Sequence, residues 1–238
     1  MVNLDKIKGI IFDYGATIDS NGVHWAEVLW KAYEDNEVPV AKQQFREAYV
    51  YGERYLAMHP VIKPEHNFHR VLSEKTTLQI NWLVAKGFLP HNEKTSAYPL
   101  AISNQCYNFV VTVLNTAKPI LEKLAYRYPM VLVSNFYGNV ETVLKDFGLG
   151  VYFKEIIESA VVGVRKPDPA IFSLGVKALG FAPEEVVVVG DSYRKDIAPA
   201  QSIGCQTIWL KGPGWEADEE GATADWVIED FKELKSLE

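Results

Sequence analysis

Each of the three most apolar short runs in this sequence ends at a polar side chain. These side chains are Asp13 after the first run, Ser134 and Asn135 after the second, and Asp191 with Ser192 after the third. Short apolar runs bounded by polar or small residues are typical of buried strands. In a parallel sheet the carboxyl ends of such strands lie at one edge, where ligands usually bind. The sequence therefore predicts that these side chains meet.

The side chains predicted at this edge have the chemistry of a phosphate site. Two converging carboxylates, Asp13 and Asp191, repel each other unless a cation lies between them, and oxygen ligands favour Mg²⁺. Lys166 lies in a loop before a predicted helix and can point at the same edge. With Ser134 it would supply a positive charge and a hydrogen bond to phosphoryl oxygens. This set is what phosphoryl transfer through an aspartyl phosphate requires.

Asp13 has three interpretations when only its own stretch is considered. It can be a nucleophile, a metal ligand, or a cap of the turn that follows. The cap is favoured from the stretch alone, because Asp close to Gly is ordinary turn chemistry. Read together with Lys166 and Asp191, a nucleophile beside a metal is favoured. The turn 15–17 could add backbone N–H groups that hold an anion.

The pattern of the remaining chain predicts the elements that position these residues. From residue 118 onward apolar strands alternate with helical patterns, which predicts an α/β fold with a Rossmann-like, doubly wound parallel sheet. The stretch before it shows helical spacing and no convincing strand, so it reads as an inserted all-helical cap domain. The predicted helical segments of this cap are 24–35, 41–58, 65–86 and 97–115. We expect a core domain of residues 1–17 and 116–238 and a cap domain of residues 18–115.

Composition excludes several classes of partner. The 24 Lys and Arg residues against 31 Asp and Glu give a net charge of −7, and no basic cluster is present. Nucleic acid and anionic membranes are therefore not expected as partners. The sequence lacks an apolar run of transmembrane length and an N-terminal apolar targeting segment. The two cysteines, Cys106 and Cys205, are far apart, which suits a reducing compartment. We expect a cytoplasmic protein.

The four motifs together resemble those of the haloacid dehalogenase-like (HAD) hydrolase superfamily, in its phosphatase-like branch with a helical cap of the C1 type. The motifs are Phe12-Asp13-Tyr14-Gly15-Ala16-Thr17, Val133-Ser134-Asn135, Arg165-Lys166-Pro167-Asp168-Pro169, and Gly190-Asp191-Ser192 with Asp196. Each motif alone is a weak signal. All four occur in the family's order across residues 12–196, and the ordered set is specific.

The resemblance implies a role for each motif residue. Asp13 would be the nucleophile, and Lys166 would neutralise the phosphoryl group. The residues implied to contact the phosphoryl group or the substrate are Thr17, Ser134 and Asn135. The implied Mg²⁺ ligands are Asp13, the backbone carbonyl of Gly15, and Asp191, with Asp196 acting through water. The implied function is a Mg²⁺-dependent phosphomonoesterase acting on a small phosphorylated metabolite.

Gly15 departs from the family's pattern. Phosphatases of the superfamily usually place a second Asp two residues after the nucleophile, where it protonates the leaving group and then activates water. General acid–base assistance is worth ~10²–10⁴-fold. Candidate substitutes are Asp19, His24 or a group delivered by the cap. Gly15 also leaves open a non-catalytic protein that binds Mg²⁺ and phosphate. A haloacid dehalogenase is disfavoured, because that chemistry needs no metal, whereas this sequence keeps Asp191 and Asp196, the residues of the implied metal site.

An aromatic and basic stretch lies within the predicted helix 41–58. Its members are Phe45, Arg46, Tyr49, Tyr51, Arg54 and Tyr55. The favoured interpretation is a buried core stripe accompanied by solvated arginines. The alternative interpretation is one wall of a substrate pocket.

Overall fold

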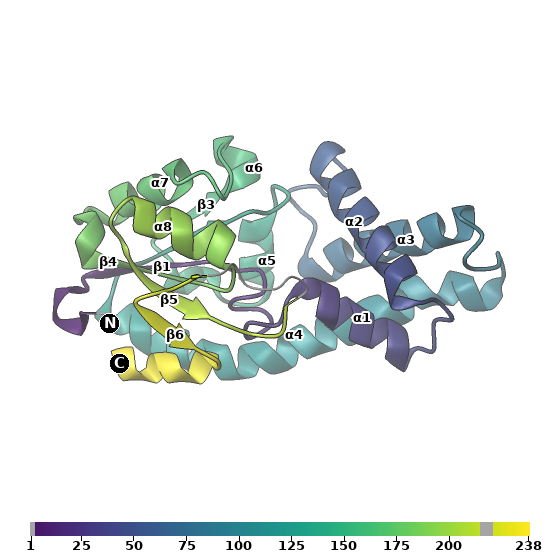
Figure 1. Cartoon of the computed structure of the whole chain (residues 1–238), viewed down its shortest axis with the longest axis horizontal. Helices are drawn as coiled ribbons and strands as arrows, with labels where there is room; N and C mark the ends of the chain where they lie inside the picture. Colours follow the sequence, from purple (N-terminus) through teal and green to yellow (C-terminus); the bar gives the residue numbers. More distant parts are fainter. Residues whose placement is uncertain (1–2, 215–220) are drawn as a thin grey trace.

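A six-stranded parallel sheet forms the centre of the computed structural model, which describes residues 3–214 and 221–238 (Figure 1). The strands are β1 (Gly9–Phe12), β2 (Met130–Ser134), β3 (Glu155–Glu158), β4 (Val186–Gly190), β5 (Gln206–Leu210) and β6 (Trp226–Ile228). Their order across the sheet is β3-β2-β1-β4-β5-β6, and all neighbouring pairs are parallel. The predicted Rossmann-like α/β fold is confirmed.

Helices cover both faces of the sheet. On β1, Ile11 packs in one apolar cluster with residues of α7 (Ala170–Leu179) and α8 (Ala198–Ser202). Ile10 and Phe12 point to the opposite face and pack with residues of α4 (Glu93–Arg127), α5 (Val140–Asp146) and the C-terminal 3₁₀ helix η5 (Phe231–Leu237). In Figure 1, α7 and α8 lie above the sheet, whereas α4 and the C-terminal helix lie below it. Burial on both faces explains why the strands are continuous apolar runs.

Four helices fill the chain between β1 and β2. They are α1 (Trp25–Asp35), α2 (Lys42–Met58), α3 (Phe68–Ala85) and α4. Helices α1, α2 and α3 lie beyond the carboxyl ends of the strands, on the right of Figure 1. We term residues 25–92 the helical insertion. It stands at the sheet edge where the sequence places the polar motif residues.

Helix α4 is longer than the sequence pattern indicates. The change of pattern at residue 118 predicts two separate helices, one over 97–115 and another that ends at residue 124, but the structure has one helix of 35 residues that contains Pro99 and Pro119. A proline inside a helix costs about 3 kcal/mol or more. The buried side chains of α4 continue at helical spacing across Pro119, from Leu114 to Leu121, so packing offsets this cost. The predicted boundary between residues 115 and 116 falls inside α4.

The sequence pattern after β4 predicts one helix from about residue 195 to 203, and the structure differs from it. The segment forms a π-helical turn, η4 (Tyr193–Ile197), followed by α8. The wide turn lets the Asp196 carboxylate accept the backbone N–H of Ser192 at 3.1 Å. Gly190 permits this approach, since a Cβ at that position would lie 2.4 Å from Cβ of Asp196. The remaining short elements are η1 (Leu4–Lys6), η2 (Gly150–Tyr152), α6 (Ser159–Val162) and η3 (Pro183–Glu185).

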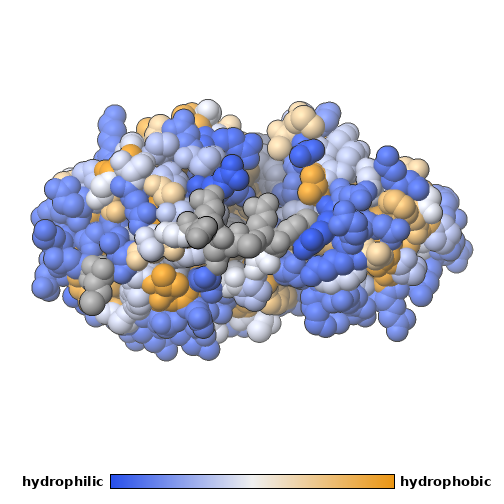
Figure 2. Space-filling view, viewed as in Figure 1, coloured by the Kyte–Doolittle hydropathy of each residue, from blue (hydrophilic) through white to orange (hydrophobic). Residues whose placement is uncertain are grey.

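The surface seen in Figure 2 is mainly hydrophilic, with apolar side chains in small scattered groups. Exposed large apolar residues occur singly on several elements, such as Leu100 on α4 and Val151 on η2. Single exposed apolar residues are normal for a folded domain. Among the described helices, none is both long and apolar enough to cross a membrane.

Candidate active site

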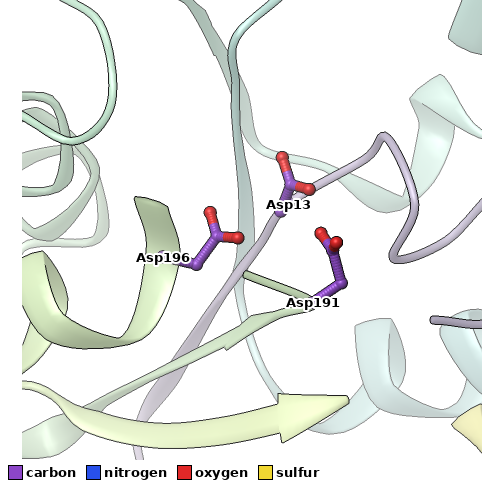
Figure 3. A group of neighbouring side chains, drawn as sticks. All are labelled: Asp13, Asp191 and Asp196. Atoms are coloured by element: carbon purple, nitrogen blue, oxygen red, sulfur yellow. The ribbon is translucent and has the colours of Figure 1, made fainter. Parts of the chain in front are cut away.

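Three carboxylates meet at the carboxyl edge of the sheet, where the strand order reverses. Asp13 follows β1, and its backbone N–H donates to the carbonyl of Val189 on the adjacent β4. Asp191 follows β4, and Asp196 comes from the π-helical turn after it. Figure 3 shows the three side chains gathered side by side. One oxygen from each carboxylate lies within 4.8 Å of the others. The gap between β1 and β4 is a topological switch point, where α/β sheets bind ligands.

Lys166 joins two of these carboxylates. Its Nζ lies 2.5 Å from Oδ1 of Asp13 and 2.6 Å from Oδ1 of Asp196. All three side chains are almost fully buried. Burial of ionised groups is tolerated when they are paired at this quality of geometry. The loop before α7 therefore brings its lysine to the sheet edge, where the sequence places it.

Thr17 connects the two strand ends. Its hydroxyl lies 3.1 Å from Oδ2 of Asp13 and 3.3 Å from Oδ1 of Asp191. The turn between Asp13 and Thr17 is tight, because Ala16 has a left-handed φ of 67°. This conformation costs a non-glycine residue roughly 1–2 kcal/mol. The Asp19 carboxylate offsets part of that cost by accepting the N–H of Ala16 at 2.7 Å.

The charges of the site shift the pKa values of its members. Burial raises the pKa of Asp13 to about 6, although Lys166 opposes the shift. Burial, followed by the charges of Asp196 and Asp13, raises the pKa of Asp191 well above its ordinary value. Burial lowers the pKa of Lys166, but the two carboxylates beside it outweigh this effect, so that pKa lies above its usual range. Burial is therefore the main cause at both carboxylates, and the neighbouring carboxylates outweigh Lys166 at Asp191 but not at Asp13.

This donor set fits a divalent cation. Three carboxylates and one lysine leave two negative charges uncompensated at the sheet edge. Carboxylate and carbonyl oxygens are the ligands that Mg²⁺ prefers in proteins. Among the described ion pairs, Lys166 contacts Asp13 and Asp196 but not Asp191. The residues present therefore supply the oxygen ligands and the negative charge that a divalent cation requires.

Ser134 is the last residue of β2, and Asn135 follows it at the same edge. The Asn135 side chain forms hydrogen bonds with the backbone of Lys166. Its Oδ1 accepts the N–H of Lys166 at 2.9 Å, and its Nδ2 donates to the carbonyl of Lys166 at 3.0 Å. Ser134 is buried as the last residue of β2. Asn135 thus orients the lysine loop, a contact that the sequence does not reveal because the partner lies 31 residues away.

The space beside Gly15 is open. A Cβ built on this residue would meet no described heavy atom within 4 Å. No described side chain therefore fills the place where the family's second Asp would begin.

The two candidate substitutes near Gly15 in sequence have structural partners. Asp19 is fully buried, and its second oxygen accepts the indole N–H of Trp25 at 3.0 Å. Burial raises the pKa of Asp19 to about 7. His24 is the N-cap of α1, where its Nδ1 accepts the N–H of Ala26 at 3.2 Å. His24 therefore caps α1, whereas Asp19 is a buried carboxylate that holds the turn after Asp13 and the Trp25 side chain.

The aromatic and basic stretch of α2 divides between two environments. Phe45 is buried against Trp30 and Tyr33, with ring centroids 5.3 and 4.8 Å away. The structure also has an open groove of about 640 Å³ on α2 and α3. Nine described residues line it, and none of them belongs to the four motifs. The basic and aromatic members of this lining are Arg46, Tyr51, Arg54, Tyr55 and Trp82. The favoured core interpretation holds for Phe45, and four members of the stretch line this surface groove instead.

Trp209 follows the fourth motif in the sequence, where it could either shape the rim of the site or only pack the last strand, and in the structure it contacts the site through the backbone of Asp191. Trp209 lies near the end of strand β5, and its indole N–H donates to the carbonyl of Asp191 at 2.7 Å. This bond fixes the backbone that presents the Asp191 carboxylate. Strand β5 pairs with β4, and Trp209 lies opposite Gly190. The rule that parallel strands end at one edge therefore indicates that Trp209 lies near Asp191.

Comparison with known proteins identifies the family. The model of the haloacid dehalogenase-like hydrolase family matches residues 7–204, which include all four motifs. The chain belongs to this family. Membership agrees with the order and spacing of the motif residues along the HAD-like chain.

Relatives of this HAD-like hydrolase include named phosphatases. Glyceraldehyde 3-phosphate phosphatase of Pyrococcus furiosus is 31% identical over 159 residues, which cover 65% of this chain and 66% of that protein. Phosphoserine phosphatase of Thermus thermophilus is 34% identical over 87 residues, which cover 37% of this chain and 34% of that protein. The matches therefore span less than two thirds of these relatives' lengths.

Solved HAD structures share the fold. The HAD-hydrolase YfnB of Bacillus subtilis, in a magnesium-bound form, has a TM-score of 0.59 at 19% identity and covers 97% of this chain and 98% of its own. A dehalogenase with an intermediate complex has a TM-score of 0.64 at 17% identity, covering 98% and 97%. At these identities the likeness concerns the fold, which phosphatases and dehalogenases share.

Proposed function

We propose that this HAD-like hydrolase is a Mg²⁺-dependent phosphomonoesterase that acts on a small phosphorylated metabolite through an aspartyl phosphate. The observation that supports it most is the buried cluster of Asp13, Asp191 and Asp196 around the ammonium of Lys166. The phosphatase names of the relatives support the same reaction class. We propose residues 18–115 as the cap and the remainder as the catalytic core.

Asp13 is the nucleophile in this proposal. Its carboxylate oxygen attacks phosphorus, and the bond from phosphorus to the leaving oxygen breaks. Lys166 and the Thr17 hydroxyl contact the two oxygens of Asp13 and hold the side chain in place. Ser134, and the N–H groups of the turn that follows Asp13, stabilise the transferred group. Water then attacks the aspartyl phosphate and releases inorganic phosphate.

The residues proposed to hold Mg²⁺ are Asp13, Asp191 and the carbonyl of Gly15, with Asp196 acting through water. When bound, the cation would neutralise charge on the phosphoryl oxygens during transfer. The raised pKa of Asp191 supports this assignment, because burial and neighbouring carboxylates penalise its ionised form. YfnB, a structural neighbour, is a magnesium-bound member of the same fold.

The open space at Gly15 sets the expected substrate preference. Without a carboxyl group two residues after the nucleophile, the leaving oxygen departs with little help from a general acid. We therefore infer slow turnover of alkyl phosphates and faster turnover of aryl phosphates, whose leaving groups need no proton. The same observation favours the second candidate, a protein that binds Mg²⁺ and phosphate without turnover.

The test is phosphate release from a panel of aryl and alkyl phosphomonoesters with Mg²⁺, compared with Asp13→Asn. Release by the wild type that is lost in the variant supports the proposal. No release, with retained binding of Mg²⁺ and of beryllofluoride, supports the non-catalytic binding protein instead. Metal-independent release of halide from a 2-haloacid would identify a dehalogenase.

A further inference from the structure

The loop after motif two is one place where the helical insertion contacts the sheet core through side-chain hydrogen bonds. We term residues 135–142 the motif-two segment. The hydroxyl of Tyr137 donates to Glu53 on α2 at 2.9 Å. Asn139 donates to the carbonyl of His66 at 2.7 Å, and Thr142 donates to the carbonyl of Pro64 at 2.6 Å. The insertion therefore docks on the strand end that carries Ser134 and Asn135.

Glu53, the partner of Tyr137, also forms a partly buried ion pair. Lys75 on α3 lies 2.7 Å from Glu53, and its side chain is 9% exposed. The same ammonium lies 5.6 Å from the centre of the Tyr137 ring. Burial lowers the pKa of Lys75, but Glu53 and Tyr137 outweigh it, so the lysine stays charged. A partly buried pair of this kind contributes little net stability but fixes the orientation of its two side chains. Glu53 is thereby held at the position where Tyr137 must meet it.

The motif-two segment is anchored on its other side to the catalytic edge. Asn135, two residues before Tyr137, makes the paired hydrogen bonds with the backbone of Lys166. The carboxylate of Glu158 accepts the N–H groups of residues 138, 139 and 140, which fixes the segment where it enters α5. Tyr137 lies between these two anchors. If Tyr137 loses its contact with the insertion, the backbone between Tyr137 and Asn135 is the part that can move.

We propose that Tyr137 is a positioning residue that couples docking of the helical insertion to the placement of Lys166. When Glu53 holds the Tyr137 hydroxyl, Asn135 is held against the lysine loop, and the ammonium is aligned with Asp13. Loss of the docking contact loosens Asn135 and with it Lys166. The catalytic consequence rests on the proposed phosphatase function, whereas the structural coupling does not.

The direct experiment is amide hydrogen exchange by NMR in Tyr137→Phe, since the N–H of Lys166 donates to Asn135. The change removes one hydroxyl and keeps the ring. We expect the Lys166 amide to exchange about fivefold faster, the effect of one lost hydrogen bond, while amides of β4 keep their rates. Glu53→Gln, which removes the charge that orients the hydroxyl, should act in the same direction. Tyr126→Phe, at a side chain 96% exposed, is the matched control.

Kinetics with a phosphomonoester that the wild type cleaves provide the second readout. Tyr137→Phe should lower kcat about fivefold with little change in KM, because alignment of Lys166 affects the transition state. An unchanged Lys166 amide, or equal acceleration in β4, would overturn the coupling. A faster Lys166 amide with unchanged kcat would overturn the catalytic role. An inactive wild type would refute the proposed function alone, because the exchange result still decides the coupling.

Discussion

The ammonium of Lys166 lies 2.5 Å from Oδ1 of Asp13, although 153 residues separate them in the chain. Both side chains are buried, and the lysine also contacts Asp196. Lys166 therefore neutralises the proposed nucleophile before substrate arrives and is placed to neutralise the phosphoryl group afterwards. Its removal should affect both stability and activity.

Lys166→Met is expected to destabilise the protein and to lower turnover. The change leaves buried carboxylates without their partner, which typically costs about 3–5 kcal/mol of unfolding free energy. Loss of an electrostatic contact to the transferred group should lower kcat by about 10²–10³-fold. Urea denaturation and phosphate release measure the two effects. Lys177→Met, at an exposed position in the last turn of α7, should leave both near wild type.

Gly15→Asp is expected to raise activity. The Cβ position at residue 15 is free of described atoms within 4 Å, so the first atom of the new side chain meets no obstacle. It would supply the proton that an alkoxide leaving group needs, and kcat for alkyl phosphates should rise within the ~10²–10⁴-fold range of acid–base assistance. Aryl phosphates should gain much less. Gly15→Asn has nearly the same shape without the proton, and an equal gain in that variant would show that acid catalysis is not the cause.

Asp19 should make stability depend on pH. Burial raises its folded-state pKa to about 7 from an ordinary value of 3.8. The folded state therefore binds this proton more tightly than the unfolded state, and the unfolding free energy falls as pH rises from about 4 to 7. The shift corresponds to a loss on the order of 4 kcal/mol. Asp19→Asn should reduce this slope in urea titrations without metal to the part that Asp13 and Asp191 contribute, whereas Asp5→Asn, an exposed control, should leave it unchanged.

Asp191→Asn should separate metal binding from folding. Burial and the charges of Asp196 and Asp13 penalise the Asp191 carboxylate in the metal-free protein. The variant should therefore melt at a higher temperature than wild type without Mg²⁺, and Mg²⁺ should stabilise it much less. Thermal melts with EDTA and with Mg²⁺ measure both. A wild-type response to Mg²⁺ in the variant would place the ion elsewhere.

The sequence predicts the sheet, the strand ends and the residues at them, because buried parallel strands are continuous apolar runs and their carboxyl ends must share an edge. It mispredicts elements whose shape depends on packing. Helix α4 crosses Pro119 because its apolar face continues, and the turn that carries Asp196 is π-helical because Gly190 lets the carboxylate approach. The pairings of Asn135 with Lys166 and of Tyr137 with Glu53 leave no local pattern, since each joins residues at least 31 positions apart.

The central claim is that Asp13 receives a phosphoryl group. The most direct measurement is acid quenching of the wild type during turnover of a ³²P-labelled phosphomonoester with Mg²⁺, followed by detection of label on the protein. We predict labelled protein whose label is released by hydroxylamine, as expected for an acyl phosphate, and none in Asp13→Asn. Equal labelling of Asp13→Asn, or phosphate release by that variant at the wild-type rate, would contradict the account.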